Sequence, residues 1–518
     1  MNNRSKLAIC MLALAVCAFA IPAMAQKTTT GIDCSQIAAL HLLQQDNMRA
    51  GQTLIECGIV EGGKDVGGSD VDFPQPPNVL VSNRSCTSAS SCTKSENMVW
   101  ENGSTVVVNY NDHNNGQYSG TSYSTDGGAT FTQILPPPFG TGHGTNYGDP
   151  IVVFNKKLNT WFAGDLASGC GGQGIGVWSS PDGITWTTGA CAHSGGSDDR
   201  ESMWVDNDPT SAGYGRMYIP FSNFAIGSGA LQVVYSDNGT SWTLVTVSNT
   251  GTFYRPVQIT GAQVSPTANR SALRGYNTVI LASMDEGGGG LATRQNVIWR
   301  SNNGGVSWTS ATTGARFPAV GDGTCASNSY FARIFPIWRH MGWGEPAVGP
   351  NNVVHYIYAG HGQGSDNGDV FYVRSADGGA TWSSPLLMNT DTPGIQYHTQ
   401  WMPSLSANPS GKVTASWYDR RSVSTACNAA TDPGCNYERF GRQSADNGLT
   451  WQASDFAIST AIIPQPQQQD GGVQSCYAGD YDYSTAQGGN AYVTWTDGRR
   501  NVGGVQVQDV NLSVIPEL

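Results

Sequence analysis

The apolar positions of this chain come in many short runs, each ended after a few residues by glycine, serine or another polar residue. Strand-like runs of this kind lie at Ala478–Ser484, Ala491–Thr496 and Val505–Leu512, with a shorter one at Asn78–Ser82. The 518 residues include 65 Gly, 20 Tyr and 15 Trp, a composition typical of short strands joined by tight turns. The pattern predicts an all-β protein.

The N-terminal stretch has a different pattern. Basic residues precede an apolar run over residues 7–21, and Ala23-Met24-Ala25 has the small-x-small form of a cleavage site. We therefore predict a signal peptide over residues 1–25 and a mature protein that is secreted or periplasmic. No later segment contains the roughly 20 uninterrupted apolar residues that span a bilayer, so no membrane span is expected.

Residues 26–68 have a helical pattern. Ser35–Arg49 contains no Gly or Pro, and a second helix is expected around Thr53–Glu56. We interpret residues 26–68 as a small disulfide-tied helical cap packed on the rest of the protein, with a partner-binding module as the alternative. The Gly- and Pro-rich stretch that follows predicts a linker, placed at residues 69–77, which leaves residues 78–518 as the main domain.

Cysteine usage agrees with export. Two of the 12 cysteines fall in the predicted signal peptide, and the remaining even number indicates disulfides. The sequence has no C-x2-C pair and no H-x3-H companion, so we expect no bound metal and no other cofactor. Pairing neighbours along the chain, and the last two by elimination, gives Cys34–Cys57, Cys86–Cys92, Cys170–Cys191, Cys427–Cys435 and Cys325–Cys476.

One short pattern occurs six times: Ser, then Asp or Asn, then Gly, then Ser or Thr before an aromatic residue. Asp and Ser side chains can bond the backbone N–H groups of a tight turn, and Gly supplies its positive φ. Each copy offers at most one carboxylate, fewer than calcium requires, so we interpret the pattern as structural. In the third copy we align Asp237 with the aspartate, which puts Tyr235 where Ser is expected. The copies end at Phe131, Trp186, Trp242, Trp308, Trp382 and Trp451.

This pattern, S-x-D-x-G-x-T-W, resembles the Asp box of the sialidase-like β-propellers. The aromatic residues that end the copies lie 55 to 74 residues apart, which suits one four-stranded antiparallel blade per copy. Residues 452–518 hold three further strand-like runs, and Asn78–Ser82 can supply a fourth strand that closes the ring. We therefore predict a seven-bladed β-propeller over residues 78–518, with a six-bladed propeller as the alternative.

The resemblance also implies where a site would lie. In propellers of this class the innermost strand of each blade opens toward the central channel, so the first polar residue of each is a candidate. Carboxylates that converge there repel one another, and they could supply a general acid with a base or nucleophile. The alternative is that these side chains bond the backbone of the neighbouring strand. The catalytic candidates are Asp149, Glu201, Arg255, Glu345 and Asp480, with His340 as a further acid or base.

Aromatic and basic residues near these strands are candidates for substrate binding. Indoles stack on sugar rings, and arginines can outweigh an acidic ring if the sugar is anionic. The candidates are Trp343, Trp401, Tyr254, Arg333 and Arg339.

Sialidases bind a sugar carboxylate with three arginines, the first in an F-R-I-P-like motif on the first blade, and use a Tyr–Glu pair and an Asp acid/base. The first blade here lacks that motif, and the similar Tyr254-Arg255-Pro256 and Arg333-Ile-Phe-Pro336 follow the third and fourth copies. We therefore expect a glycoside hydrolase or polysaccharide lyase acting on extracellular or periplasmic carbohydrate at the channel mouth, not a strict sialidase. A non-catalytic glycan- or protein-binding propeller is the alternative.

The charge balance excludes one class of partner. The net charge is −12, and no Lys/Arg cluster is large enough to displace counterions from nucleic acid. We expect carbohydrate as the partner, no nucleic acid, and a monomeric protein.

Overall fold

A computed structural model describes residues 28–64, 78–82, 91–114, 117–134, 142–262, 275–326, 328–335, 338–423, 435–468 and 470–518. The predicted signal peptide and linker, together with Cys86 and Cys427, lie outside these residues. Strands dominate the described part, which has one α-helix, α1 (Met48–Glu56), so the prediction of an all-β protein is confirmed. No helix in this part is long and apolar enough to cross a membrane.

Seven sheets of four or five strands contain most of the described chain, and their strands pair antiparallel except at one position. The first three contain β2 (Thr93–Asn102), β3 (Thr105–Asn114), β4 (Gln117–Ser124) and β5 (Thr132–Gln133); β6 (Ile151–Asn155), β7 (Thr160–Ala167), β8 (Gly174–Ser180) and β9 (Thr187–His193); and β10 (Asp198–Asp199), β11 (Trp204–Val205), β12 (Met217–Asn223), β13 (Ala230–Ser236) and β14 (Thr243–Ser248).

The next three sheets have the same antiparallel order. They contain β15 (Tyr254–Gly261), β16 (Val279–Asp285), β17 (Gln295–Ser301) and β18 (Thr309–Thr312); β22 (Glu345–Val348), β23 (Val354–Gly360), β24 (Asp369–Ser375) and β25 (Leu386–Leu387); and β26 (Gln400–Ala407), β27 (Val413–Asp419), β28 (Asn436–Ser444), β29 (Phe456–Ala457) and β30 (Ile463–Pro464).

The last large sheet joins the two ends of the described strands. Its order is β1 (Val79–Leu80), β36 (Asp509–Pro516), β33 (Asn490–Asp497) and β32 (Thr485–Gln487), and Val79 pairs with Leu512. The pairing is the one expected of Asn78–Ser82. Strand β31 (Asp482–Tyr483) pairs parallel with β2 and belongs to the first sheet. The remaining strands are β19 (Gly323–Thr324), β20 (Ala332–Phe335), β21 (Trp338–Arg339), β34 (Asn501–Val502) and β35 (Val505–Gln506).

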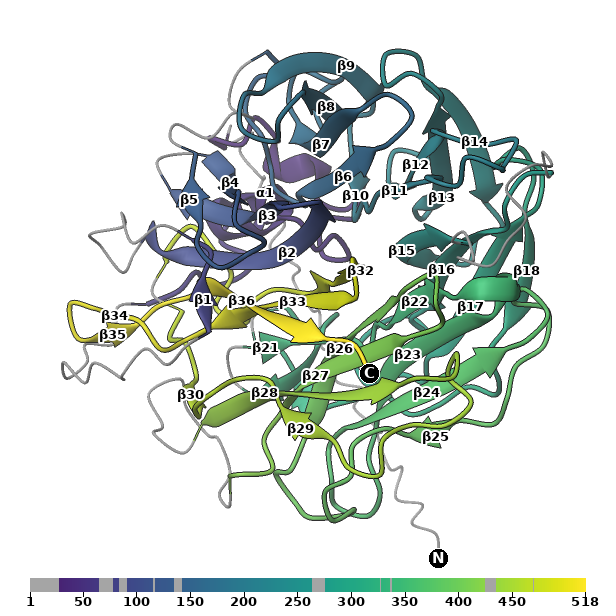
Figure 1. Cartoon of the computed structure of the whole chain (residues 1–518). Coiled ribbons are helices and arrows are strands. Elements are labelled where there is room, and N and C mark those ends of the chain that lie inside the picture. Colours follow the sequence, from purple (N-terminus) through teal and green to yellow (C-terminus); the bar gives the residue numbers. More distant parts are fainter. Residues whose placement is uncertain are drawn as a thin grey trace, which may run out of the picture.

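The sheets are set around a common centre (Figure 1). The strand nearest to this centre, called the first strand below, is the first along the chain in six sheets and β32 in the last sheet. Strand β2 contacts β6, β15 contacts β22, and β22 contacts β26. Strand β11 links β6 to β15, and β32 contacts both β26 and β2. The first strands therefore form a closed circuit, and buried apolar side chains fill the space between neighbouring sheets.

The repeated pattern forms turns, as predicted. In the first copy Ser124 Oγ accepts a hydrogen bond from Gly128 N at 2.9 Å, and Asp126 Oδ1 accepts one from Thr130 N at 2.9 Å. The copies at Asp377 and Asp446 have the same bonds. Because these bonds satisfy backbone donors that no strand partner reaches, they stabilise the turn.

The alignment of the third copy was wrong by one residue. Ser236 Oγ accepts from Gly239 N at 2.8 Å, and Asn238 Oδ1 accepts from Ser241 N at 2.9 Å. Asp237 instead forms an ion pair with Arg216 at 2.7 Å. Asn has the acceptor oxygen that the turn needs, so the aspartate beside it is not required there.

The N-terminal segment, residues 28–64, is less helical than predicted. It has a 3-10 turn at Cys34–Gln36 and then turns up to residue 44, where the prediction placed a helix; α1 covers the second predicted helix. The reason is local, because Asn47 Oδ1 accepts from Ala50 N at 2.9 Å and so caps α1 at that point.

Three of the predicted disulfides are confirmed: Cys34–Cys57, Cys170–Cys191 and Cys325–Cys476. Cys92 and Cys435 are also disulfide-bonded, and the partners predicted for them are Cys86 and Cys427.

Candidate functional site

A group of charged side chains lies where the first strands begin, and the N-terminal segment covers it. Each member is at most 3% exposed. We call this group the central cluster: Asp46, Asp149, Asp199, Arg200, Arg255, Glu286, Arg339 and Asp480. Several come from the predicted starts of inner strands, since Asp149 directly precedes β6 and Asp480 lies just before β31.

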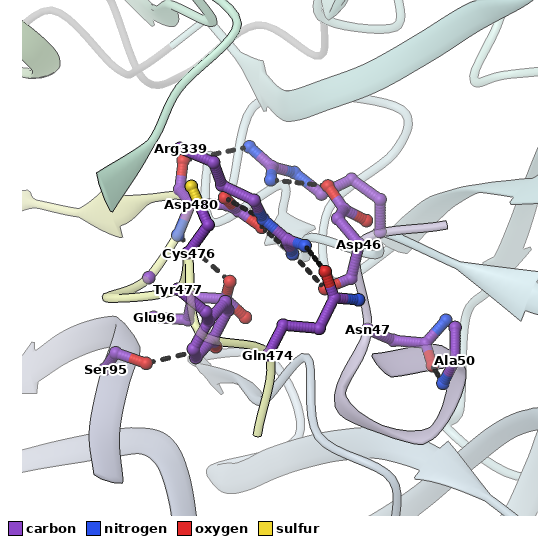
Figure 2. A network of polar contacts seen from close by, with 12 residues as sticks. Asp46, Asn47, Ala50, Ser95, Glu96, Arg339, Gln474, Cys476, Tyr477 and Asp480 are labelled. Atoms are coloured by element: carbon purple, nitrogen blue, oxygen red, sulfur yellow. Dashed lines mark hydrogen bonds and ion pairs between the residues drawn. The ribbon is translucent and has the colours of Figure 1, made fainter. Parts of the chain in front are cut away.

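Asp46 of the N-terminal segment is at the middle of the cluster. Its Oδ2 lies 2.9 Å from Arg200 Nη1, and its Oδ1 lies 3.1 Å from Arg255 Nη1. Arg339 Nη2 donates to the main-chain oxygen of Asp46 at 2.7 Å (Figure 2). Three guanidinium groups from three different sheets therefore converge on one residue.

The arginines also have partners within the propeller. Arg339 donates to both carboxylate oxygens of Asp480, at 2.6 and 3.0 Å for the shortest contact to each (Figure 2). Arg255 Nε lies 2.7 Å from Glu286 Oε1. Arg200 has its guanidinium carbon 4.5 Å from the ring centroids of both Trp343 and Tyr481. Ion pairs and aromatic faces together hold the cations in fixed positions.

A tyrosine and a glutamate form a pair at the edge of the cluster. Tyr330 Oη donates to Glu286 Oε2 at 2.6 Å, and Trp343 Nε1 donates to Glu286 Oε1 at 2.7 Å. Burial raises the pKa of Tyr330 well above its ordinary value, and the charge of Glu286 raises it further. The phenol is therefore neutral, and the nearest base to take its proton is Glu286.

Burial and mutual repulsion set the protonation of the carboxyl groups. Burial raises the pKa of Asp149 to about 7, and the charge of Asp46 acts in the same direction. Burial also raises the pKa of Asp199 well above its ordinary value. For Asp46, burial acts upward, but Arg255, Arg200 and Arg339 together hold its pKa below the ordinary value. Asp46 is thus the ionised member, and Asp149 can hold a proton near neutral pH.

The structure brings together five of the predicted site residues: Asp149, Arg255, Arg339, Asp480 and Trp343. Glu201 lies near them, and burial raises its pKa well above its ordinary value, with Asp149 adding to the shift. Neither carboxylate oxygen of Glu201 has a hydrogen-bond partner in the described part of the chain.

Two of the acidic candidates bond backbone of the next sheet, which was the alternative interpretation. Asp149 Oδ2 accepts from Arg200 N at 2.9 Å, and Glu345 Oε2 accepts from Leu405 N at 3.1 Å. Asp149 also belongs to the central cluster. Among the described residues, Glu345 forms no hydrogen bond or ion pair with a member of the central cluster, so we leave Glu345 out of the site.

His340, Trp401, Arg333 and Tyr254 are not part of the central cluster. His340 Nε2 accepts from Met402 N at 3.3 Å, and burial lowers the His340 pKa to about 3, so the ring is neutral. Trp401 is fully buried and stacks on Tyr418 with ring centroids 5.3 Å apart. Tyr254 packs edge-on against Trp299, and Arg333 forms no ion pair among the described residues.

Sequence reasoning missed five residues of the site: Asp46, Asp199, Arg200 and Glu286 of the central cluster, and Tyr330 beside it. Asp199 and Arg200 directly precede the predicted Glu201, and only the directions of their side chains were unknown. Glu286 directly precedes the run Gly287–Gly290, and its place after β16 was the one available signal. Asp46 and Tyr330 lie outside any repeat, so no register could point to them.

Comparisons with known proteins add the following. No protein-family model and no curated sequence matches the chain. Solved structures similar to it include a Dyadobacter fermentans protein of unknown function (14% identity, TM-score 0.39, 86% of this chain and 99% of that one) and an α-L-arabinofuranosidase mutant from Fusarium graminearum (14%, 0.41, 66% and 91%). An intramolecular trans-sialidase from Ruminococcus gnavus is also similar (13%, 0.36, 83% and 95%).

These structures are distant, with TM-scores below 0.5. The resemblance to sialidase-like propellers therefore rests on the turns and sheets described above. The Asp-box turns and the sheets around one centre are what the resemblance implied. A fold of this kind does not define a chemistry, which depends on the residues of the site.

Among the described residues, two groups of side chains have possible ligand atoms close enough together to hold a metal ion. One is His143 with Cys170 and Cys191, but these cysteines form a disulfide and offer no thiolate. The other is Asp46, Asp149 and Asp199, whose nearest oxygens lie within 4.8 Å of one another. Arginines already offset the charge of this second group, so we assign it no metal.

A cavity that is separate from the central cluster lies at the opposite ends of the first strands. It has a volume of about 500 Å³ and is lined by Trp100, Trp204 and Tyr214 with polar residues such as Asn207 and Asn408. Its size is within the range of small-molecule sites.

Proposed function

We propose that the protein is an exported, seven-bladed propeller that hydrolyses a glycosidic bond in a carbohydrate bearing a carboxylate, at the central cluster. The blade count is supported by the seven large sheets and by the closed circuit of their first strands. Export is supported by the three disulfides, since such bonds persist in oxidising compartments.

The observation that carries the proposal is the convergence of Arg200, Arg255 and Arg339 on Asp46. Two guanidinium groups hold its carboxylate, which marks the position where a substrate carboxylate would bind. The Tyr330–Glu286 pair lies beside the same arginines, because Glu286 is also the partner of Arg255.

These groups can divide the roles of a retaining hydrolysis. Tyr330 Oη attacks the anomeric carbon and gives its proton to Glu286, while Asp149 gives its proton to the leaving oxygen. Water then attacks the same carbon and gives a proton to Asp149, and Tyr330 recovers its proton from Glu286. An Asp149 pKa of about 7 suits an acid at neutral pH.

Hydrolysis fits better than the lyase alternative. A lyase needs a base beside a tyrosine, and His340 was predicted as a further acid or base without being assigned to a lyase. Its ring accepts a backbone hydrogen bond and lies edge-on to Trp343, with ring centroids 5.6 Å apart. Burial lowers the His340 pKa to about 3, so it is a weak base.

A second candidate function is glycan binding without catalysis. It is favoured by the cavity of about 500 Å³, because Trp100, Trp204 and Tyr214 offer aromatic surface of the kind that sugars contact. This site and the central cluster lie at opposite ends of the first strands, so separate variants address them.

The test uses the full mature chain and fluorogenic glycosides of uronic, sialic and neutral sugars. We expect turnover of an acidic glycoside, and Tyr330→Phe to lower kcat by about 10²–10⁴-fold through loss of the nucleophile. Tyr123→Phe is the matched control, since Tyr123 lies on β4 at the edge of the core. Turnover that survives Tyr330→Phe would contradict the proposal; binding without turnover that is lost in Trp100→Ala would favour the second candidate.

A further inference from the structure

The N-terminal segment satisfies the polar groups of the central cluster as a ligand would. Asp199 accepts hydrogen bonds from Asp46 N at 3.1 Å, from Asn47 N at 3.2 Å and from Asn47 Nδ2 at 2.7 Å. Arg255 Nη2 donates to the main-chain oxygen of Gln44, and Asn328 Nδ2 donates to that of Leu43 at 3.2 Å. Leu43, Gln44, Asp46 and Asn47 thus bond donors and acceptors of the propeller.

The segment leaves no room for another occupant. The cavity beside Asp46, lined by Asn47, Arg339 and Tyr477 among others, has a volume of about 10 Å³. That is about the space of one water molecule, far below the volume of a sugar. A substrate can reach Arg200 and Arg255 only after the segment has moved.

Asp46 supplies the charge that the arginines need. It is at most 3% exposed, and it contacts both Arg200 and Arg255. Arg200 has no other carboxylate within 4.0 Å in the described part of the chain. Without Asp46, or a carboxylate in its place, a buried guanidinium would lose its counter-charge, which is unfavourable.

The segment is held as a preformed unit. The Cys34–Cys57 disulfide closes a loop that contains Asp46, and α1 begins two residues after it. Its far end is anchored by an antiparallel bridge between Gly62 and Gln474 and by Gly63 N, which donates to Val473 O at 2.9 Å. A loop closed in this way loses little conformational entropy on docking.

We infer that residues 28–64 are a built-in inhibitor, with the Asp46 carboxylate occupying the position of the substrate carboxylate. The inference rests on the proposed function for the identity of the competitor. A ligand that needs the open state binds with an apparent Kd equal to the intrinsic Kd divided by the open fraction. Weakening the Asp46 contacts raises that fraction and tightens the apparent affinity.

The test is chemical rescue in the full mature chain at pH 7. We expect Asp46→Ala to melt at a lower temperature than wild type, and sodium acetate at tens of millimolar to recover much of the loss by placing a carboxylate between Arg200 and Arg255. Sodium chloride at equal ionic strength should not. The matched control is Glu61→Ala, which removes an exposed carboxylate of the same segment and should show no acetate effect.

A second variant covers poor folding of Asp46→Ala. Asp46→Asn keeps the side-chain shape and removes the charge, and we expect it to bind glucuronate at least ten-fold more tightly than wild type by calorimetry. Equal acetate responses in Asp46→Ala and wild type, or equal glucuronate affinities in Asp46→Asn and wild type, would overturn the inference. Neither readout involves turnover. Tighter glucuronate binding by Asp46→Asn, with no hydrolysis of any glycoside by that same variant, would sink the proposed function and leave the competition between the segment and a carboxylate ligand intact.

Discussion

Aspartates at the periphery and at the centre of this protein behave in opposite ways. In the turns of the repeated pattern, hydrogen bonds from Ser124 and Thr130 lower the pKa of Asp126 to about 2. In the central cluster, burial raises the pKa of Asp149 to about 7. The first carboxylate is in water with several donors, whereas the second is buried beside other acids with one backbone donor.

The difference shows that residue type and repeat register do not define a role. Both aspartates occur in repeated positions of the sequence, and both accept backbone hydrogen bonds. Only Asp149 can hold a proton near neutral pH, because it is buried beside other acids. The periphery therefore stabilises the blades, and the centre holds charges that a ligand can use.

Among the variants that test this comparison, Arg255→Ala is expected to change the free energy of unfolding the most. The change leaves Asp46, Asp199 and Glu286 buried without their shared cation, and removal of one partner from such a group costs roughly 3–5 kcal/mol of unfolding free energy. Lys64→Ala is the control, because its pair with Glu61 is exposed and contributes little. Urea unfolding measures both, and equal midpoints would mean that the central charges do not stabilise the fold.

The pH dependence sharpens the comparison. A carboxyl whose pKa is raised by folding binds more protons in the folded state, so stability falls as pH rises through that pKa. Asp149, at about 7, should contribute about 1 kcal/mol of lost stability between pH 6.5 and 8.5. Asp149→Asn should reduce this slope, and Asp377→Asn should not, because hydrogen bonds in its turn lower the pKa of Asp377. If Asp149→Asn leaves the dependence of stability on pH unchanged, the buried proton is held by another residue.

The smallest effect tests the third turn. Asn238→Ala removes the acceptor for Ser241 N and should cost about 1 kcal/mol of stability. Asp237→Ala removes only a part-exposed ion pair with Arg216 and should cost about half as much or less. The reverse order in thermal unfolding would restore the alignment that the sequence suggested.

The fold was largely predictable because it repeats. Six copies of one turn fixed the spacing of the sheets, and the closing strand could be found by counting, as the pairing of Val79 with Leu512 shows. The same logic placed Asp149, Arg255 and Asp480 near one axis. It also admitted Glu345 and His340, whose side chains bond backbone instead.

The rest depends on contacts between distant segments. Asp46 lies in a stretch of helical composition, and nothing local indicates that it reaches Arg200, 154 residues away in sequence. Tyr330 and Glu286 meet because two loops from neighbouring sheets approach each other. The repeat pattern contains no information on such contacts. The sequence therefore predicted part of the site, but not that Asp46 lies within it.

The N-terminal segment is docked on the charged centre of the folded protein. Hydrogen–deuterium exchange of the wild-type chain tests it most directly, because the amides of Asp46 and Asn47 donate to buried Asp199. We expect protection of both amides comparable to that of the strand amides of β15. Exchange of both within seconds, while β15 stays protected, would contradict it.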